Sequence, residues 1–293
     1  MNFRMVHLIK SMRPLQWTKN GFIFIPPLFS GVLFSSDIVV KLTLTFIFFS
    51  LVSSGVYLFN DIIDIDADKH HHLKKKRPFA SGLITIKLAS VTIIILHGVS
   101  ISISYLYLGS EIALILITYI IINLFYSIGL KNIVILDAFI VSSGFILRIF
   151  AGSAVTQISP SPWILLTTFF LALFISYGKR RSELSVLGDA SEPHRLVLGN
   201  YSTDMLDHII SVLGGIIIIS YSMYTISNQA LRFGNPFMVY TVPVVTYGIL
   251  RYFYLIHAGG EGGNPTELLL KDMHIWLSVL IWASMSIIVI YWI

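Results

Sequence analysis

The feature that most constrains this chain is a series of apolar runs, each near the length of a membrane span, that recurs to the C-terminus. A helix needs about 20 mostly apolar residues to cross the hydrocarbon core of a bilayer. Charged residues and Gly, Pro or Ser separate the runs and mark the ends of the predicted helices. The nine predicted spans cover residues 21–36, 39–59, 86–107, 111–128, 133–151, 161–178, 208–227, 237–256 and 274–292. The sequence therefore predicts an all-α integral membrane protein, with residues 1–293 as a single domain.

Composition excludes a water-soluble fold. Only 12% of the residues are charged, against about 25% in soluble domains, and the mean hydropathy is +0.80. A signal peptide does not explain the runs, because Met1 to Asn20 is polar and basic. The absence of cysteine excludes disulfides, thiolate catalysis and Cys-ligated metals. The net charge of +5 does not indicate nucleic-acid binding, because the loops are too short to form a basic domain.

The basic residues gather in alternate loops, with only Lys41 and Arg232 clearly in the others. Loops rich in Lys and Arg remain in the cytoplasm, so nine spans predict a cytoplasmic N-terminus and an external C-terminus. The chain is then a multi-pass protein of the cell membrane whose acidic clusters face the cytoplasm. For most of the cations on the predicted cytoplasmic side, the topological signal is a sufficient explanation. The full set on that side is Arg4, Lys10, Arg13, Lys19, Lys69, Lys74, Lys75, Lys76, Arg77, Lys131, Lys179, Arg180, Arg181, Arg195 and Lys271.

An acidic motif follows the second span directly. At 100° per residue, Asp61, Asp64 and Asp68 share one helix face, with Asn60 at its edge and Asp66 on the opposite side. Like charges at this spacing repel, so a helix keeps them at low cost only when a cation lies among them. Hard oxygen ligands favour Mg²⁺, which binds substrate phosphates through a few carboxylates. The alternative is a solvated acidic loop that ends a membrane span.

Basic residues follow the motif at once. His71, Lys74 and Arg77 precede Pro78, which ends the segment before the next span. Arg77 can contact phosphate oxygens at two points, whereas Lys74 is a point charge. Together with the carboxylates, they predict a magnesium–diphosphate site that opens to the cytoplasm.

The pattern Asn-Asp-x-x-Asp-x-x-x-Asp, followed by His71, Lys74 and Arg77-Pro78, resembles the first aspartate-rich motif of the UbiA superfamily of intramembrane prenyltransferases, which are nine-helix bundles. Further segments resemble the decaprenyl-phosphate phosphoribosyltransferases of that superfamily, over about residues 10–284. These segments are 13–20, 126–131, 144–148 with Ala151-Gly152, 178–184 and 250–252. The resemblance implies transfer of a 5-phosphoribosyl group from phosphoribosyl diphosphate to a polyprenyl phosphate, on the way to the arabinosyl lipid donor of cell-wall polymers.

The second large cytoplasmic loop departs from the superfamily. Enzymes that prenylate aromatic acceptors carry a second Asp-x-x-x-Asp motif there, whereas this chain has Lys179-Arg180-Arg181-Ser182-Glu183. A phosphoribosyl donor and a lipid phosphate bring two phosphoryl groups besides the diphosphate, which suits the added cations. The alternative is a topological signal alone. In the first loop, His72 stands where the superfamily usually has proline, which puts the turn in doubt and not the ligands.

The resemblance and the charges together assign roles. The predicted catalytic residues are Asp61, Asp64 and Lys131, and the predicted Mg²⁺ ligands are Asn60, Asp61, Asp64 and Asp68. The predicted phosphate-binding residues are Lys19, Lys74, Arg77, Tyr126, Lys179, Arg180 and Glu183. The predicted partners are phosphoribosyl diphosphate, a polyprenyl phosphate and the lipid bilayer, and a homo-oligomer is left open.

Several alternatives stay open. Asp137 and Arg148 lie on one face of the fifth span, where charges are usually functional, but a buried structural network fits them as well. The Gly259–Gly263 loop is read as a lid or linker rather than a phosphate cradle. Prenyl transfer to an aromatic acceptor is the rival activity. A transporter is disfavoured, because the carboxylates concentrate at the cytoplasmic face and not at the middle of the membrane.

Overall fold

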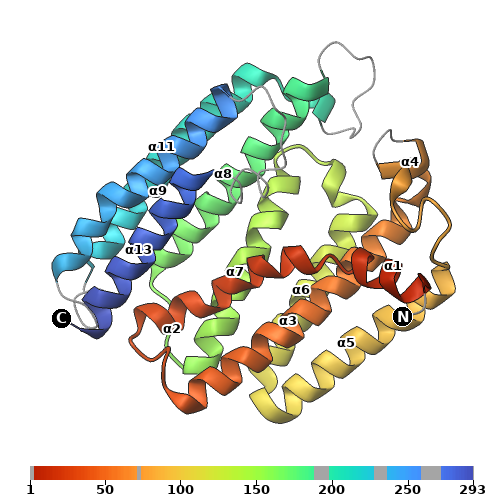
Figure 1. The fold of residues 1–293 in the computed structure, drawn as a ribbon, viewed down its shortest axis with the longest axis horizontal. Coiled ribbons are helices and arrows are strands. Elements are labelled where there is room, and N and C mark those ends of the chain that lie inside the picture. The colour runs from red at the N-terminus through yellow and green to blue at the C-terminus, as the bar shows by residue number, and fades with distance from the viewer. Residues whose placement is uncertain (1–2, 71–73, 188–197, 228–235, 259–271, 293) are drawn as a thin grey trace. The chain divides into compact units, whose positions relative to one another are not determined.

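Helices are the only regular elements in the part of the chain that the computed structural model describes, residues 3–70, 74–187, 198–227, 236–258 and 272–292 (Figure 1). Eight helical segments are long and apolar enough to cross a membrane, which confirms the all-α membrane fold. The α-helices are α1 (Phe3–Ser11), α2 (Ile25–Phe29), α3 (Ser36–Ile63), α4 (Ile65–His70), α5 (Ile86–Leu108), α6 (Ser110–Ile128), α7 (Leu136–Thr156), α8 (Pro162–Leu187), α9 (Thr203–Thr225), α11 (Val242–Ala258) and α13 (Met273–Tyr291). The 3₁₀ helices are η1 (Pro14–Phe24), η2 (Lys74–Lys76), η3 (Leu130–Asn132), η4 (Leu198–Asn200) and η5 (Pro236–Thr241).

The first predicted span, residues 21–36, is not one long helix. The 3₁₀ helix η1 passes into the five-residue helix α2, and α3 starts only at Ser36. Pro26 and Pro27 have no N–H to donate to the carbonyls four residues back, so an α-helix cannot run through them with its hydrogen bonds intact. The count of nine spans, and with it the placement of the termini on opposite sides, stays a prediction.

The chain divides into two compact units. The first consists of residues 1–27, 33–133 and 147–158, and the second of residues 28–32, 134–146 and 159–293. Helix α7 gives its first half to the second unit and its last turns to the first. The single domain over residues 1–293 remains a prediction.

Helix α3 is the central element of the first unit. It packs against both α5 and α6, which lie beside it in Figure 1. Its residues Phe49 and Val52 are fully buried against Leu116 of α6. Ser53 and Ser54 satisfy their hydroxyls by donating to the Ser50 carbonyl of the same helix, as small polar residues do in closely packed membrane helices. This packing fixes the helix whose end carries the acidic motif.

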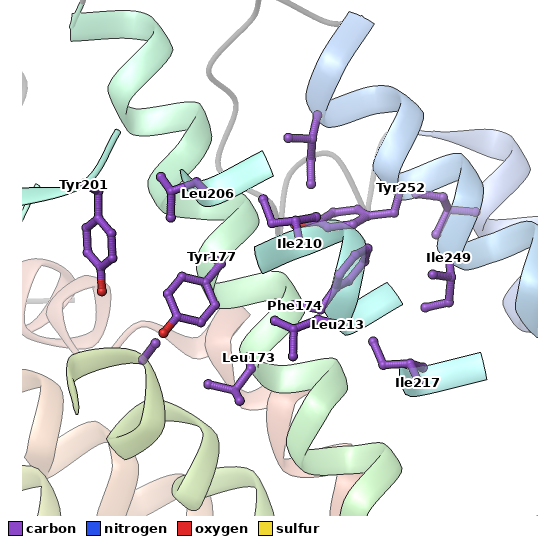
Figure 2. Packing of buried hydrophobic residues seen from close by; sticks show 13 residues of the cluster. Leu173, Phe174, Tyr177, Tyr201, Leu206, Ile210, Leu213, Ile217, Ile249 and Tyr252 are labelled. Atoms are coloured by element: carbon purple, nitrogen blue, oxygen red, sulfur yellow. The ribbon is translucent and has the colours of Figure 1, made fainter. Parts of the chain in front are cut away.

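The second unit is held by an apolar cluster among three helices. Phe174 and Tyr177 of α8 contact residues of α9 and α11, including Ile210 and Tyr252 (Figure 2). The rings of Phe174 and Tyr252 lie 5.2 Å apart. Helices α9, α11 and α13 are neighbours in Figure 1. The unit thereby holds the C-terminal half of α8, where the second basic cluster lies, against α9.

An ion pair and a cap fix the start of α13. Asp272 accepts the Ile275 N–H at 2.9 Å through Oδ1 and the Arg251 guanidinium at 2.8 Å through Oδ2. The hydrogen bond from Arg251 lowers the pKa of the Asp272 carboxyl. Because the pKa is lower in the folded state, the carboxylate stabilises the fold above the unfolded-state value of about 3.9 and loses this effect as the pH falls below it.

We therefore expect Asp272→Asn, which keeps the capping group, to melt below the wild type at neutral pH. The gap between the two melting temperatures should close as the pH falls below about 4. Tryptophan fluorescence during heating in detergent measures both proteins across the pH range. A gap that widens on acidification contradicts the assignment.

A close approach in the first unit depends on glycine. A Cβ at Gly152 of α7 would lie against the carbonyl oxygen of Ile23, and 3.2 Å from a ring carbon of Pro26. The carbonyl belongs to rigid backbone and cannot move aside as a side chain can. We expect Gly152→Ala to destabilise the protein by about 1–3 kcal/mol, the usual range for overpacking. Thermal unfolding measures the loss.

Gly98 of α5 is the matched control for Gly152. It also lies inside a membrane helix of the first unit, but nothing comes within 4 Å of its Cβ position. Gly98→Ala should leave the melting temperature unchanged or raise it, since alanine lowers the entropy of the unfolded chain. Equal losses in the two variants would contradict the close contact with Ile23.

Candidate active site

The acidic motif lies where α3 passes into α4. Helix α3 ends at Ile63, Asp64 departs from helical geometry with φ −90° and ψ 4°, and α4 starts at Ile65. Hydrogen bonds nevertheless continue across the break, because the Asp64 N–H donates to the Asn60 carbonyl at 3.0 Å and the Asp68 N–H to the Asp64 carbonyl at 2.8 Å. The helical spacing is therefore nearly preserved, and Asp61 and Asp68 remain on one side.

One arginine joins these two carboxylates. Arg77 donates to Asp68 at 2.8 Å and to Asp61 at 3.3 Å. The Asp61 and Asp68 side chains are only 3% and 6% exposed, so both charges are withdrawn from water. Asp61 accepts a second guanidinium from Arg13, whose Nη2 lies 2.5 Å from the same Oδ1 oxygen. Such pairing offsets part of the cost of burying a carboxylate.

Asp64 has a different set of partners. It forms an ion pair with Lys131 of η3, and Asn60 donates to its other oxygen at 2.9 Å. Its side chain is more open to solvent than those of Asp61 and Asp68. Asp66 points away, is 92% exposed and pairs with Lys69, which agrees with its predicted place on the opposite face. The hydrogen bond from Lys69 lowers the pKa of the Asp66 carboxyl.

The second basic cluster lies on α8 in the other unit. Lys179 is 41% exposed, and its Nζ lies 3.7 Å from Glu183 Oε1. Arg180 is instead buried, and its Nε donates to Asp137 at 2.7 Å while its Nη1 donates to the Ser176 carbonyl at 2.8 Å. Each nitrogen of that guanidinium already has a protein acceptor. In this geometry Lys179, and not Arg180, is accessible to a phosphate.

Asp137 is the centre of that buried network. Its side chain is completely buried, and the Tyr201 hydroxyl donates to Oδ1 at 3.4 Å. The same hydroxyl accepts the Ile135 N–H at 2.7 Å. Burial raises the pKa of Tyr201, so the phenol stays protonated as a donor. Asp137 therefore belongs to a buried polar network, and a functional role for it stays a prediction.

Arg148 belongs to a separate polar group in the first unit. It is buried, and its Nε donates to Asn20 at 2.8 Å and its Nη2 to the Tyr119 hydroxyl at 3.4 Å. Its guanidinium lies 4.8 Å from the centre of the Phe49 ring, a cation–π contact. Asp137 and Arg148 share the predicted face of α7, yet each has its own partners.

Comparison with known proteins identifies the family. The model of the UbiA prenyltransferase family matches residues 24–277. The chain is 33% identical to a decaprenyl-phosphate phosphoribosyltransferase of Mycolicibacterium smegmatis, over 94% of this chain and 89% of the relative. It is 31% identical to the Corynebacterium glutamicum protein of that name, over 97% of this chain and 86% of the relative. The chain belongs to the UbiA prenyltransferase family.

A solved member of the UbiA family shares the fold. The chain matches a UbiA homolog from Archaeoglobus fulgidus, solved with GPP and Mg²⁺, with a TM-score of 0.71 and 17% identity, over 97% of this chain and 99% of that one. At this identity the likeness shows the fold alone.

The acidic motif of this UbiA member offers the right atoms for magnesium. Within the described ranges, no three His, Asp or Glu side chains are arranged so that they could hold a metal ion together. The three predicted carboxylates do not converge on one point, because Arg13, Arg77 and Lys131 occupy them. The donor set is nevertheless all oxygen and carries three negative charges. Magnesium in proteins is commonly held by one or two carboxylates and the substrate's phosphates, so these residues fit a metal that arrives with a diphosphate.

The other predicted phosphate-binding residues of the first unit are all partly exposed. Lys19 of η1 and Lys74 of η2 are half-buried, and Tyr126 is half-buried in the last turn of α6. Helix α6 ends with Gly129 as its C-cap, and Lys131 follows in η3, where it pairs with Asp64. His72 and the Gly259–Gly263 loop lie outside the described residues.

Arg13 is the site residue that sequence reasoning missed as a ligand. It lies 48 positions from Asp61 and directly precedes Pro14, the first residue of η1. Its backbone is left-handed, with φ 54° and ψ 61°, which is uncommon for a residue other than glycine. The sequence does place this cation immediately before a Pro at the predicted membrane boundary. The positive charge of the cytoplasmic loops explains Arg13 equally well, however, so the pattern alone does not identify it as a site residue.

Proposed function

We propose that this protein transfers a 5-phosphoribosyl group from phosphoribosyl diphosphate to a polyprenyl phosphate and releases diphosphate. The observation that carries the proposal is the cluster at the end of α3, where three carboxylates that suit a metal are paired with three cations that suit phosphates. The relatives named decaprenyl-phosphate phosphoribosyltransferase, each more than 30% identical over almost the whole chain, supply the choice of donor. The product belongs to the supply of arabinosyl donors for the cell wall.

In this proposal the carboxylates bind the metal and the cations bind the phosphates. Asn60, Asp61, Asp64 and Asp68 would hold Mg²⁺ together with the substrate's phosphates, and the ion would supply charge stabilisation for the departing diphosphate. Arg77 and Lys131 bind phosphate oxygens, Arg77 through its planar fork and Lys131 as a point charge. The further phosphate-binding residues that the sequence predicts are Lys19, Lys74, Tyr126, Lys179 and Glu183.

The reaction needs little proton transfer. The bond between ribose C1 and the diphosphate oxygen breaks, the electron pair leaves with the diphosphate, and an oxygen of the polyprenyl phosphate forms the new bond to C1. A phosphate monoester has a second pKa near 6, so the acceptor is already anionic at neutral pH. The residues therefore act by positioning the two phosphates and by stabilising charge, not as a strong general base.

The membrane supplies the acceptor. The polyprenyl tail is apolar and dissolves in the bilayer that the helices span, while the phosphates approach the polar end of α3. We place this end on the cytoplasmic side of the plasma membrane, because the flanking loops hold most of the basic residues.

The direct test incubates purified full-length protein with labelled phosphoribosyl diphosphate, decaprenyl phosphate and Mg²⁺. We expect a labelled lipid that is soluble in organic solvent, and its loss when EDTA removes the metal. A parallel reaction receives a polyprenyl diphosphate and 4-hydroxybenzoate as a representative aromatic acceptor. Prenylated aromatic product without any phosphoribosyl lipid would overturn the proposed donor and favour the rival activity.

A further inference from the structure

Arg13 lies in the acidic cluster without an established role there. Its guanidinium binds Asp61 on one side and lies 5.1 Å from the centre of the Tyr57 ring on the other. Tyr57 and Asp61 are four residues apart on α3, so one helix face presents both the aromatic platform and the carboxylate. Arg13 is 29% exposed. Its side chain is therefore held in one direction and still reached by solvent.

The charges of the cluster cancel in the protein alone. Asp61, Asp64 and Asp68 carry three negative charges, and Arg13, Arg77 and Lys131 carry three positive ones. A divalent metal added to this arrangement raises the local charge to about +2. Diphosphate brings the negative charge that compensates for the metal. The cluster therefore favours the metal and diphosphate together over the metal alone.

Of the two arginines in the cluster, Arg13 is the better placed to exchange partners. Among the described residues, Asp61 is the one carboxylate it pairs with, whereas Arg77 is shared between Asp61 and Asp68. A guanidinium has five N–H donors, and Arg13 contacts Asp61 through its Nη2 nitrogen. Donors remain for phosphate oxygens, which guanidinium groups bind at two points.

We infer that Arg13 holds Asp61 in the place of a metal in the free protein and binds the diphosphate when metal and diphosphate enter. Arg13 is then a substrate-binding residue that also competes with the metal. The inference rests on the proposed function only in that a diphosphate binds at the acidic motif, and prenyl transfer would require the same.

The two roles of Arg13 predict effects of opposite sign. Arg13→Ala removes the competitor from Asp61, so Mn²⁺ alone, a spectroscopic substitute for Mg²⁺, should bind about tenfold more tightly. The same change removes a charge-assisted hydrogen bond to phosphate, so inorganic diphosphate in saturating Mg²⁺ should bind at least about tenfold more weakly. Arg13→Lys keeps the charge and loses the fork, and should lie between alanine and wild type for diphosphate.

Electron paramagnetic resonance of free Mn²⁺ and calorimetric titration with diphosphate measure the two affinities in the full-length protein. Lys10→Ala is the matched control, because it removes one exposed positive charge three residues away in α1. It should leave both affinities unchanged. If Arg13→Ala does not fold, Arg13→Asn replaces it, since asparagine tolerates the left-handed backbone.

Affinities for Mn²⁺ and diphosphate that move in the same direction in Arg13→Ala, or that both match those of Lys10→Ala, overturn the inference. These assays contain neither ribose nor lipid. The binding results for the Arg13 variants therefore do not depend on whether the protein transfers phosphoribosyl groups. Failure of the proposed function and failure of the inference about Arg13 can thus be told apart.

Discussion

Asp61→Asn should lower phosphoribosyl transfer at least about a hundredfold while the protein still folds. Asp61 is the carboxylate on which Arg13 and Arg77 meet, and its side chain is nearly inaccessible to water. Asparagine has almost the same shape but carries no charge and offers one oxygen, so both the metal and the two guanidinium groups lose a charged partner. Loss of one such group commonly costs 10²–10³ in rate or 10–100-fold in metal affinity, as orders of magnitude.

The fold should tolerate Asp61→Asn, because both arginines remain partly exposed and can be hydrated. Asp66→Asn is the control for this variant. It removes the same charge five residues along, from an exposed side chain that contacts only Lys69 among the ion pairs of the described residues. Activity is measured as labelled phosphoribosyl lipid formed per minute, with thermal unfolding recorded on the same samples. If both variants lose activity equally, net charge and not the Asp61 position explains the loss.

Local spacing predicted much of this site. The i, i+3 and i+7 spacing placed Asp61 and Asp68 together and Asp66 apart, and hydrogen bonds across the break at Asp64 preserve that arrangement. The helix break itself was not predicted. Asp64 lies at this break, and its side chain pairs with Lys131.

Contacts between distant segments could not be predicted in this way. Arg13 reaches Asp61 only because η1 packs along α3, and no local pattern encodes that path. The first predicted span is not a single helix, and the cause is local. Prolines count as only mildly unfavourable in a hydropathy window, but they remove specific hydrogen bonds from a helix. Hydropathy predicted the other eight spans, because a helix qualifies as a membrane span by its length and apolar composition alone.

Arg180 shows why residue type does not determine role. In the sequence it stands between two other cations and is predicted to bind phosphate, but its side chain leaves the helix about 100° away from that of Lys179. Its partner Asp137 is 43 positions away. The sequence pattern groups Asp137 with Arg148 instead, because those two residues share a predicted helix face. A basic triplet on a helix must point in three directions, about 100° apart, so one of its members is directed inward when the helix is packed.

Arg180→Met should be the most destabilising single change, by about 3–5 kcal/mol, because it leaves the Asp137 carboxylate buried without its cation. Thermal unfolding by tryptophan fluorescence is the suitable measurement, since the chain has no cysteine for thiol-reactive dyes. Lys179→Met, one residue away and 41% exposed, is the control and should cost less than about 1 kcal/mol.

The double variant Asp137→Leu/Arg180→Met separates a structural role of Arg180 from phosphate binding. Replacing both members of a buried ion pair by apolar residues is often neutral or stabilising, so the double variant should regain most of the melting temperature lost in Arg180→Met. If Arg180 serves only the fold, phosphoribosyl transfer returns together with stability, and the phosphate contacts of this helix rest on Lys179. A double variant that is stable but at least about tenfold less active would instead restore Arg180 as a phosphate ligand, because then its charge acts on the substrate as well as on Asp137.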